Sequence, residues 1–264
     1  MELSSLKVVR LEPGALELYW TVAPTQEDLS GALVDVYRSE APSENIEEYE
    51  VVKSNIALDT YSVKDDTLNG LEHGSRKWFY KVKVTPVVGD PFFFPAKYSY
   101  VNSESTSKVW ARIYRDKKLG LDKRNGVTLY LLKKRSWGTR CEVSWDPILF
   151  ANNGRVCDTC DCFGTGWRAG YFSPQAFRGM IQPSPTQKQL ALWGEFYPSD
   201  SFLYMLNTPP IEPGDIIVNP QTDDRFEVMR VRYLQTLGVN IEQQAQLSKI
   251  HIDDEIYKIP VNND

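Results

Sequence analysis

The chain has 264 residues, of which 42% are hydrophobic and 25% are charged, with a formal net charge of −5. These proportions exclude a disordered chain and predict a globular protein of one large β domain or two modest domains, able to bury a core without disulfides. The sequence shows no signal-peptide core and no run of about 18 apolar residues, so we expect no membrane span and folding in a cytoplasm.

Charge is unevenly distributed along the chain. Residues 101–140 carry 11 basic and 3 acidic side chains, whereas residues 1–100 carry 10 and 16, and residues 141–264 carry 9 and 16. Such a basic segment is either a solvated linker surface or a contact with an acidic partner subunit or nucleic acid. No reading helix or base-stacking motif accompanies it, which argues against sequence-specific nucleic-acid binding.

The first hundred residues show the alternation typical of strands. "ALELYWTV" places Leu16, Leu18 and Trp20 on one face, and "ALVDVYRS" and "KWFYKVKVTPV" alternate in the same way. Turn clusters rich in Gly, Pro, Ser or Asn separate these runs. Short strands at this spacing predict a β-sandwich over residues 1–104.

The positions of particular residues add a resemblance over about residues 4–104. A Trp on an early strand, a Tyr on the next, a Leu and a Gly before a late strand, and a Tyr-x-Val-x-Val strand follow one another: Trp20, Tyr37, Leu71, Gly74, Tyr80, Val82 and Val84. This half of the chain resembles a fibronectin type III domain. The resemblance implies a two-sheet sandwich, and because such domains bind partners or act as spacers, function does not follow from the fold.

Residues 105–124 change to a helical period. Apolar residues recur at helical intervals, namely Val109, Ile113, and Leu119 or Leu121. Hydroxyl side chains in residues 103–107 offer N-caps, and Gly120 is a candidate stop. We expect one linker helix of three or four turns that lays this apolar stripe on a neighbouring domain.

From residue 125 the strand pattern returns and predicts a β-rich, barrel-like domain over residues 125–264. Asn125-Gly126 is a tight-turn signal, and "VTLYLLKK" reads as a strand. Pro213-Gly214-Asp215 predicts a turn that feeds a strand at residues 216–218, rather than a catalytic use of Asp215. A further turn is expected at Asp223-Asp224.

All four cysteines lie in the segment 141–167, at Cys141, Cys157, Cys160 and Cys162. They could form disulfides, a redox centre, a chance cluster of buried thiols or a metal site. The absence of a secretory signal argues against disulfides, and the absence of a thioredoxin-like βαβ context argues against a redox relay. A chance cluster of core cysteines stays open.

The metal interpretation fits the spacing. Cys157 and Cys160 form a Cys-x-x-Cys turn, and Cys162 adds a third sulfur. The segment between Cys141 and Cys157 is long enough to fold back, so that the Cys141 sulfur is the fourth ligand of a tetrahedral zinc ion. Gly164 and Gly166 would let the backbone curl around the metal. We therefore predict a structural zinc loop over residues 141–167, with a three-cysteine site completed by another group as the alternative. Four protein ligands would leave no position for water, which argues against hydrolysis there.

Neither the histidines nor the glycine-rich segment suggests an enzyme. The two histidines, His73 and His251, lie in no motif with a nucleophile, and "GTGWRAG" lacks the flanking elements of a nucleotide loop. We predict that the chain is not an enzyme. Six aromatic residues around the cysteines are expected to form a small core rather than a sugar-stacking platform: Trp137, Trp145, Trp167, Tyr171, Phe172 and Trp193.

The second half carries another resemblance, over about residues 105–261. The runs that carry it are "LYLLKKRSWGTRC", "SWDP", "CFGTGWRAGYFSP", "QKQLALWGEFYPSD", "IEPGDIIV" and "RFEVMRV". They are similar to the zinc-loop half of tailed-bacteriophage virion structural proteins of the neck or head-to-tail connector. In that pattern two short cysteine pairs precede the Gly-Thr-Gly, whereas here Cys141 stands alone and three cysteines follow.

The resemblance implies a non-enzymatic structural subunit that forms an oligomeric ring in the neck, collar or head-tail connector of the virion. Its partners would be copies of itself and other virion proteins of the neck, portal or tail, assembled in the host cytoplasm. A closed ring needs two different surfaces that meet head to tail, and blocks of opposite charge would fix their register. The alternative is a tail or baseplate module that binds carbohydrate or another part of the host surface.

Overall fold

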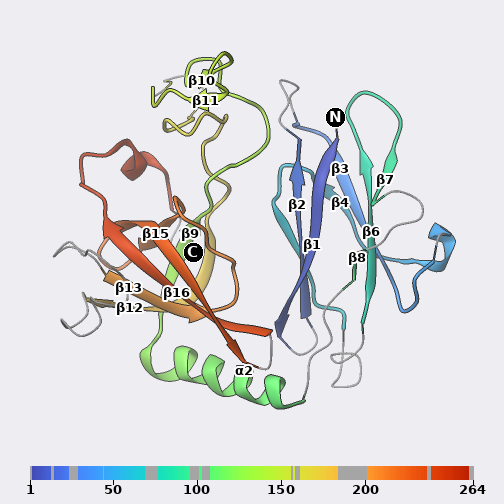
Figure 1. Cartoon of the computed structure of the whole chain (residues 1–264), viewed down its shortest axis with the longest axis horizontal. Coiled ribbons are helices and arrows are strands. Elements are labelled where there is room, and N and C mark those ends of the chain that lie inside the picture. Colours follow the sequence, from blue (N-terminus) through green and yellow to red (C-terminus); the bar gives the residue numbers. More distant parts are fainter. Residues whose placement is uncertain are drawn as a thin grey trace. The chain divides into compact units, whose positions relative to one another are not determined.

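The computed structural model describes residues 2–12, 15–23, 29–43, 45–68, 77–95, 101–102, 108–155, 157, 161–183, 201–236 and 239–261. The chain divides into two compact units, one of residues 1–111 with 135–170 and one of residues 112–134 with 171–264. The predicted fold class is confirmed, because the described residues form mainly strands, one α-helix and a closed β-barrel (Figure 1).

The first unit contains a sandwich of two antiparallel sheets. One sheet has the order β1-β2-β5, from strands β1 (Leu3–Glu12), β2 (Ala15–Val22) and β5 (Ser62–Asp65). The other has the order β4-β3-β6-β7, with β8 also paired to β6. Its strands are β3 (Leu33–Ser39), β4 (Glu50–Ala57), β6 (Phe79–Thr85), β7 (Phe92–Phe94) and β8 (Val101–Asn102), and a short 3-10 helix, η1 (Ile46–Glu48), precedes β4.

The expected burial of the apolar side chains is confirmed on β2 and β6, but the alternation is broken at Glu17 and Lys81, which are 4% and 2% exposed. Leu16, Leu18 and Trp20 are all buried, and the indole Nε1 of Trp20 donates a hydrogen bond to the carbonyl of Leu58 at 3.2 Å. Tyr80 is buried in the same way on β6. Leu71 and Gly74, which contributed to the fibronectin resemblance, lie outside the described residues.

A buried polar network joins the two sheets of the sandwich. Asp65 on β5 accepts a hydrogen bond from the Arg38 guanidinium on β3 at 2.8 Å and one from the Tyr80 hydroxyl on β6 at 2.7 Å. Burial raises the pKa of Tyr80, and the Asp65 carboxylate raises it further. A buried charge pair that lost one partner would leave the other charge unsolvated, so this network fixes the sheets against each other.

The second unit is built on a closed six-stranded antiparallel barrel with the order β12-β13-β16-β15-β14-β9. Its strands are β9 (Val127–Leu132), β12 (Gln175–Pro183), β13 (Ser201–Leu206), β14 (Ile216–Asn219), β15 (Asp224–Thr236) and β16 (Val239–Lys249). A 3-10 helix, η3 (Glu255–Lys258), follows β16. Closure pairs each strand on both sides and so removes the exposed sheet edges that promote aggregation.

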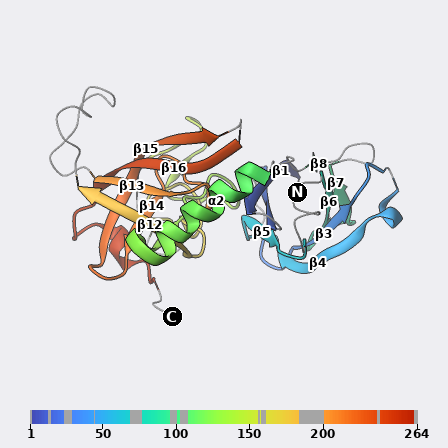
Figure 2. The same cartoon turned by 90° about the horizontal axis from the view of Figure 1, so that it is seen from below.

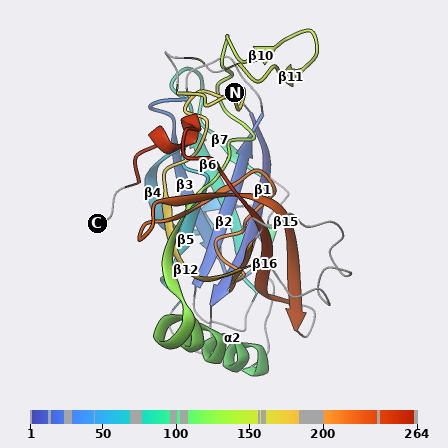
Figure 3. The ribbon, with the colours of Figure 1, turned by 90° about the vertical axis from the view of Figure 1, so that its left-hand side faces the viewer.

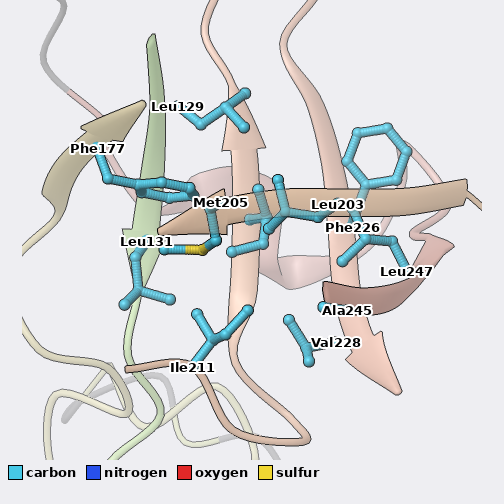
Figure 4. Packing of buried hydrophobic residues seen from close by; sticks show 11 residues of the cluster. Leu129, Leu131, Phe177, Leu203, Met205, Ile211, Phe226, Val228, Ala245 and Leu247 are labelled. Atoms are coloured by element: carbon cyan, nitrogen blue, oxygen red, sulfur yellow. The ribbon is translucent and has the colours of Figure 1, made fainter. Parts of the chain in front are cut away.

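Apolar side chains from the barrel strands pack together in its interior (Figure 4). Leu129 and Leu131 come from β9, Leu203 and Met205 from β13, and Leu247 from β16, so residues two apart on one strand point the same way. The expected turn at Pro213 and Gly214 is present, and β14 begins at Ile216. A second turn at residues 220–223 leads into β15 at Asp224, close to the turn expected there.

The single α-helix of the described residues, α2 (Lys108–Gly120), continues into a π-helical turn, η2 (Leu121–Asn125) (Figure 2). The expected apolar stripe is wrong in part, because Val109 and Leu119 are 58% and 45% exposed, whereas Ile113 and Leu121 are half-buried. Trp110 and Tyr114 are buried instead. These aromatics are four residues apart and bury more apolar area than a valine and a leucine. The buried side of the helix therefore begins at Trp110 and not at Val109, one residue later than predicted.

The C-terminal end of this helix lies where the sequence predicts it. Helix α2 ends at Gly120 as expected, and the tight turn expected at Asn125-Gly126 is the end of the π turn, with the Gly126 amide donating to the carbonyl of Leu121 at 2.9 Å. The hydroxyl caps expected at residues 103–107 lie outside the described residues.

Candidate metal centre in the cysteine loop

The cysteines lie on a long loop, residues 135–170, whose two arms are joined by backbone hydrogen bonds. The Arg135 amide donates to the carbonyl of Gly170, and the Cys141 amide donates to the carbonyl of Gly166, both at 3.0 Å. An isolated bridge pairs Arg140 with Trp167 farther along the stem. The stem therefore brings Cys141, from the outgoing arm, next to the returning Gly-Thr-Gly segment.

Three of the four predicted ligands come together. Cys141, Cys157 and Cys162 are buried and form one cluster, and no disulfide joins any two of them. The fourth predicted ligand, Cys160, lies outside the described residues. The expectation that the excursion from Cys141 returns to the later cysteines therefore matches the fold of the loop.

The backbone around these sulfurs is shaped as a ligand loop requires. The Ser144 amide approaches the Cys141 sulfur at 3.5 Å, and the carbonyl of Cys162 accepts hydrogen bonds from the Thr165 amide at 2.9 Å and the Thr165 hydroxyl at 2.8 Å. Gly164 and Gly166 have φ angles of +71° and +89°, a conformation that glycine adopts without the Cβ clash of other residues. Amides directed at sulfur are a common outer shell of thiolate metal sites.

The donor chemistry fits a soft, tetrahedral ion such as zinc and does not fit calcium or magnesium, which take oxygen ligands. Within the described ranges, which leave out Cys160, no group of three or more His, Cys, Asp or Glu side chains forms a metal-holding arrangement. Zinc held by Cys141, Cys157, Cys160 and Cys162 therefore stays a prediction, supported by the cluster of three thiols.

The aromatic residues around the loop are mostly core. Trp137, Trp167, Tyr171 and Phe172 are buried, as the core interpretation expects. The rings of Trp145 and Trp167 lie 5.9 Å apart, and the Arg140 guanidinium lies 3.9 Å from the centroid of Trp145. A guanidinium over an indole face is attracted by the negative ring face, so this stack stiffens the stem. Trp193 lies outside the described residues.

The loop packs with the sandwich. The Arg135 guanidinium binds Asp59, in the connection between β4 and β5, through two hydrogen bonds of 2.5 and 2.8 Å. The compact unit of the sandwich accordingly includes residues 135–170. This grouping differs from the sequence-based division, which assigned the loop to a domain of residues 125–264. A bidentate ion pair between residues 76 positions apart carries no local sequence signal.

The tip of the loop carries a feature that sequence reasoning missed. A short hairpin of β10 (Trp145–Asp146) and β11 (Ala151–Asn152) lies there (Figure 3). Between its two strands, Ile148, Leu149 and Phe150 are 85%, 72% and 74% exposed. The Asp146 carboxylate accepts hydrogen bonds from the amides of Ile148 at 2.8 Å and Leu149 at 3.1 Å, which fixes the turn. We call residues 148–150 the apolar tip. The run Pro-Ile-Leu-Phe, between turn residues, was the available signal.

A second missed feature is a buried charge network in the barrel unit. The Lys133 ammonium donates to Asp215 at 3.0 Å and to Glu212 at 2.9 Å, and the Asp215 carboxylate also accepts from the backbone amides of Lys134 and Glu212. Burial raises the pKa of Asp215, while the charge of Lys133 and the amide donors oppose that rise. Asp215 therefore fastens the Pro213-Gly214 turn to the end of β9, in line with the structural role expected for it.

His251 is exposed, with Nδ1 3.2 Å from the Asp253 carboxylate, and His73 lies outside the described residues. In the part of the chain that the structure describes, no helix is long and apolar enough to span a membrane.

Comparisons with known proteins add little to this geometry. No protein-family model matches the chain, and no curated protein matches it. Among solved structures the chain is similar to one described as "Titin kinase and its flanking domains", with a TM-score of 0.27 and 9% identity, over 94% of this chain and 37% of that one. The chain thus spans little more than a third of that structure, and a TM-score this low carries no argument.

Proposed function

We propose that this chain is a non-enzymatic structural subunit of a tailed-phage virion, which forms an oligomeric ring in the neck, collar or head-tail connector. The sequence resemblance of residues 105–261 supports the virion assignment, and the architecture of the loop supports an assembly role. Ring neighbours would be further copies of the chain, and the axial neighbours would be other virion proteins of the neck, portal or tail.

The observation that carries the proposal is the apolar tip held on a structured base. Three consecutive large apolar side chains are more than 70% exposed, although burying such side chains is worth about 1.5–3 kcal/mol each. Contiguous exposed apolar surface on a soluble protein marks an interaction site. The turn is fixed by Asp146, and the buried thiols lie on the same loop, so the tip is a preformed contact rather than a loose segment.

Zinc would serve this role by stiffening the loop. Cys141, Cys157, Cys160 and Cys162 would hold it as thiolates, and a four-sulfur site has no position for a substrate or an attacking water. The chain's own contribution is the turn at Gly164 and Gly166 and the Ser144 amide directed at the Cys141 sulfur. The stiffened stem would keep the tip in one orientation in every copy.

The alternative, a tail or baseplate module that binds carbohydrate, gains no support from the aromatics around the cysteine loop that the structure describes. Sugar stacking needs exposed aromatic faces, whereas Trp137, Trp167, Tyr171 and Phe172 are buried. Trp145 lies beneath the guanidinium of Arg140. The apolar tip itself offers two aliphatic side chains and one phenyl ring, which suits a protein partner better than a polar glycan.

Immunogold electron microscopy of phage particles that carry this chain tests the assignment. Antibodies raised against the purified chain are expected to label the junction of head and tail. Particles without label, or label confined to tail fibres or baseplate, would contradict a neck subunit. As the matched control, antibodies pre-adsorbed with the purified chain are expected to give no label.

A further inference from the structure

Helix α2 has a second, solvent-exposed face that none of the features above explains. Its exposed positions Val109, Arg112, Asp116 and Leu119 recur at intervals of three and four residues, which places them along one side of the helix. Arg115 is exposed three residues after Arg112. This side therefore combines apolar and basic side chains, opposite the buried aromatics.

The basic side chains here have few partners. Lys117 pairs with Glu242 at 3.0 Å, and Asp122 lies 3.9 Å from Arg178. Among the described residues, no ion pair engages four further cations of this segment, namely Arg112, Arg115, Lys123 and Arg124. We call the surface of Val109, Arg112, Arg115 and Leu119 on α2 the basic face.

The sandwich carries a surface of opposite character. Glu47 and Glu48 are exposed in η1, and Val51, which is 55% exposed, follows on β4. Within the described residues neither glutamate has an ion-pair partner, whereas Glu50 beside them is bound by Arg38. We call Glu47, Glu48 and Val51 the acidic edge.

The acidic edge lies at an open margin of a sheet. Strand β4 is the last strand of the order β4-β3-β6-β7 and pairs with β3 on one side, so its other side has no partner strand in the described fold. Two register shifts between β3 and β4 distort this margin, which disfavours the addition of another strand. A helix laid along a sheet margin is one of the ways in which proteins cover it.

We propose that the basic face of α2 in one copy docks on the acidic edge of the sandwich in the next copy. The two surfaces match in charge, and each adds apolar area, from Val109 and Leu119 on one side and Val51 on the other. Complementary charges of this kind fix register and suppress wrong pairings. This inference rests on the proposed ring function and names the surfaces that build the ring.

The composition of the basic face favours a protein partner over nucleic acid. A phosphate-binding surface gains affinity from cations alone, and binding weakens steeply with salt. Here Asp116 directly follows Arg115, and two exposed apolar side chains occupy the same side of the helix. Apolar contact area of this kind suits a protein surface instead.

The two surfaces are different and lie in different parts of the chain, so their contact is heterologous. Each copy would donate its helix to one neighbour and accept a helix from the other. Repetition of a heterologous contact gives a closed ring when the rotation closes, which is the geometry that the proposed function requires.

Charge reversal and charge exchange test the contact in the full-length chain. The variant Arg112→Glu/Arg115→Glu and the variant Glu47→Lys/Glu48→Lys are each expected to weaken self-association by about tenfold or more, measured by sedimentation over a range of concentrations. Combining the four changes restores opposite charge, so association is expected to return to within about threefold of the wild type. All four positions are exposed, so the variants keep the fold, which circular dichroism would verify.

Matched controls separate this contact from a general charge effect. Arg232→Glu and Asp90→Lys reverse exposed charges outside both surfaces and are expected to leave association unchanged. A wild-type ring that survives both double reversals would overturn the docking surfaces while leaving the ring function intact. A wild-type chain that is monomeric at every concentration would overturn both.

Two further outcomes would also overturn the docking proposal. The first is loss of duplex DNA binding in Arg112→Glu/Arg115→Glu with assembly intact, because the basic face would then be a phosphate-binding surface. The second is an effect of the charge reversals on a monomeric chain that does not change with protein concentration. The basic face and the acidic edge would then contact each other within one chain and not between copies.

Discussion

Trp20 is one of the largest fully buried side chains of the molecule and donates a hydrogen bond to the Leu58 carbonyl inside the sandwich. Truncation would remove its apolar contacts and leave that carbonyl without a donor. We predict that Trp20→Ala lowers the free energy of unfolding of the sandwich by about 3–5 kcal/mol, measured by urea denaturation. A change below about 1 kcal/mol would show that Trp20 does not face the core.

Tyr80 makes the stability of the sandwich depend on alkaline pH. Its folded-state pKa is raised above the ordinary value of 10.0 by burial and by the Asp65 carboxylate. The unfolded chain therefore loses this proton first, so the contribution of Tyr80 to stability is fully present below pH 10 and is lost as the pH rises above it. Each pH unit above 10 should remove up to about 1.4 kcal/mol.

Tyr80→Phe provides the comparison. The variant cannot ionise at this position, so its free energy of unfolding should fall less steeply between pH 10 and 11 than that of the wild type, in urea titrations at fixed pH. Equal slopes in the two proteins would contradict a raised pKa at Tyr80. The variant also loses the hydrogen bond to Asp65, so only the slopes are compared.

Single residues differed in how far the sequence could predict them. The alternation of apolar and polar residues around Trp20 and Tyr80 predicted that both side chains are buried. Successive side chains of a strand point to opposite sides of the sheet, so the apolar set faces the core when one side is buried. Asp215 was assigned to a turn, but its partner Lys133 was not found, since the two residues are 82 positions apart. The predicted ligands Cys141, Cys157 and Cys162 do cluster, which spacing alone could anticipate.

Among the secondary-structure elements, the turn before β14 is fastened to the end of β9 by the Lys133–Asp215 pair. Asp215→Asn would remove the charge that compensates the buried ammonium, so we predict a loss of about 3–5 kcal/mol in the stability of the barrel. Thermal unfolding followed by circular dichroism measures it. The matched control is Glu212→Gln, which alters the other partner of Lys133, whose side chain is 65% exposed, and should cost under about 1 kcal/mol. Equal losses in the two variants would contradict a buried pair.

The cysteine loop gives a prediction at the same scale. Cys157→Ser would remove one sulfur from the buried cluster, so amide hydrogen exchange in residues 141–167 should rise by about tenfold or more, together with a loss of bound zinc. The barrel strands should keep their protection. Arg155→Ala, at an exposed position of the same loop, is the control. Unchanged exchange and retained zinc in Cys157→Ser would remove the metal hypothesis.

The helix shows where element-level prediction failed. Its existence and its end at Gly120 followed from the helical period and the glycine, but its buried side did not, because Val109 and Trp110 are both apolar. Tertiary packing buried Trp110 and Tyr114 and left Val109 and Leu119 exposed, beside Arg112 and Arg115 on the basic face. The spacing of apolar residues in this segment therefore predicts that a helix forms, but it does not predict which side of the helix is buried.

For the whole molecule, the mainly β class and the barrel were predictable from strand patterns, whereas the membership of the loop was not. The two compact units interleave along the chain, since residues 135–170 return to the sandwich unit between two barrel strands. The Arg135–Asp59 pair that accompanies this return is visible only in three dimensions. The sequence therefore predicted the strands and the helix better than it predicted which of them belong to the same compact unit.

Native mass spectrometry of the purified full-length chain tests the central claim most directly, because one spectrum reports both assembly and metal. The account predicts a discrete oligomer of three or more copies, with one zinc ion per chain that is lost together with thiol ligation in Cys157→Ser. A metal-free monomer at concentrations up to about 100 µM, well above the micromolar range of specific interfaces, would contradict it.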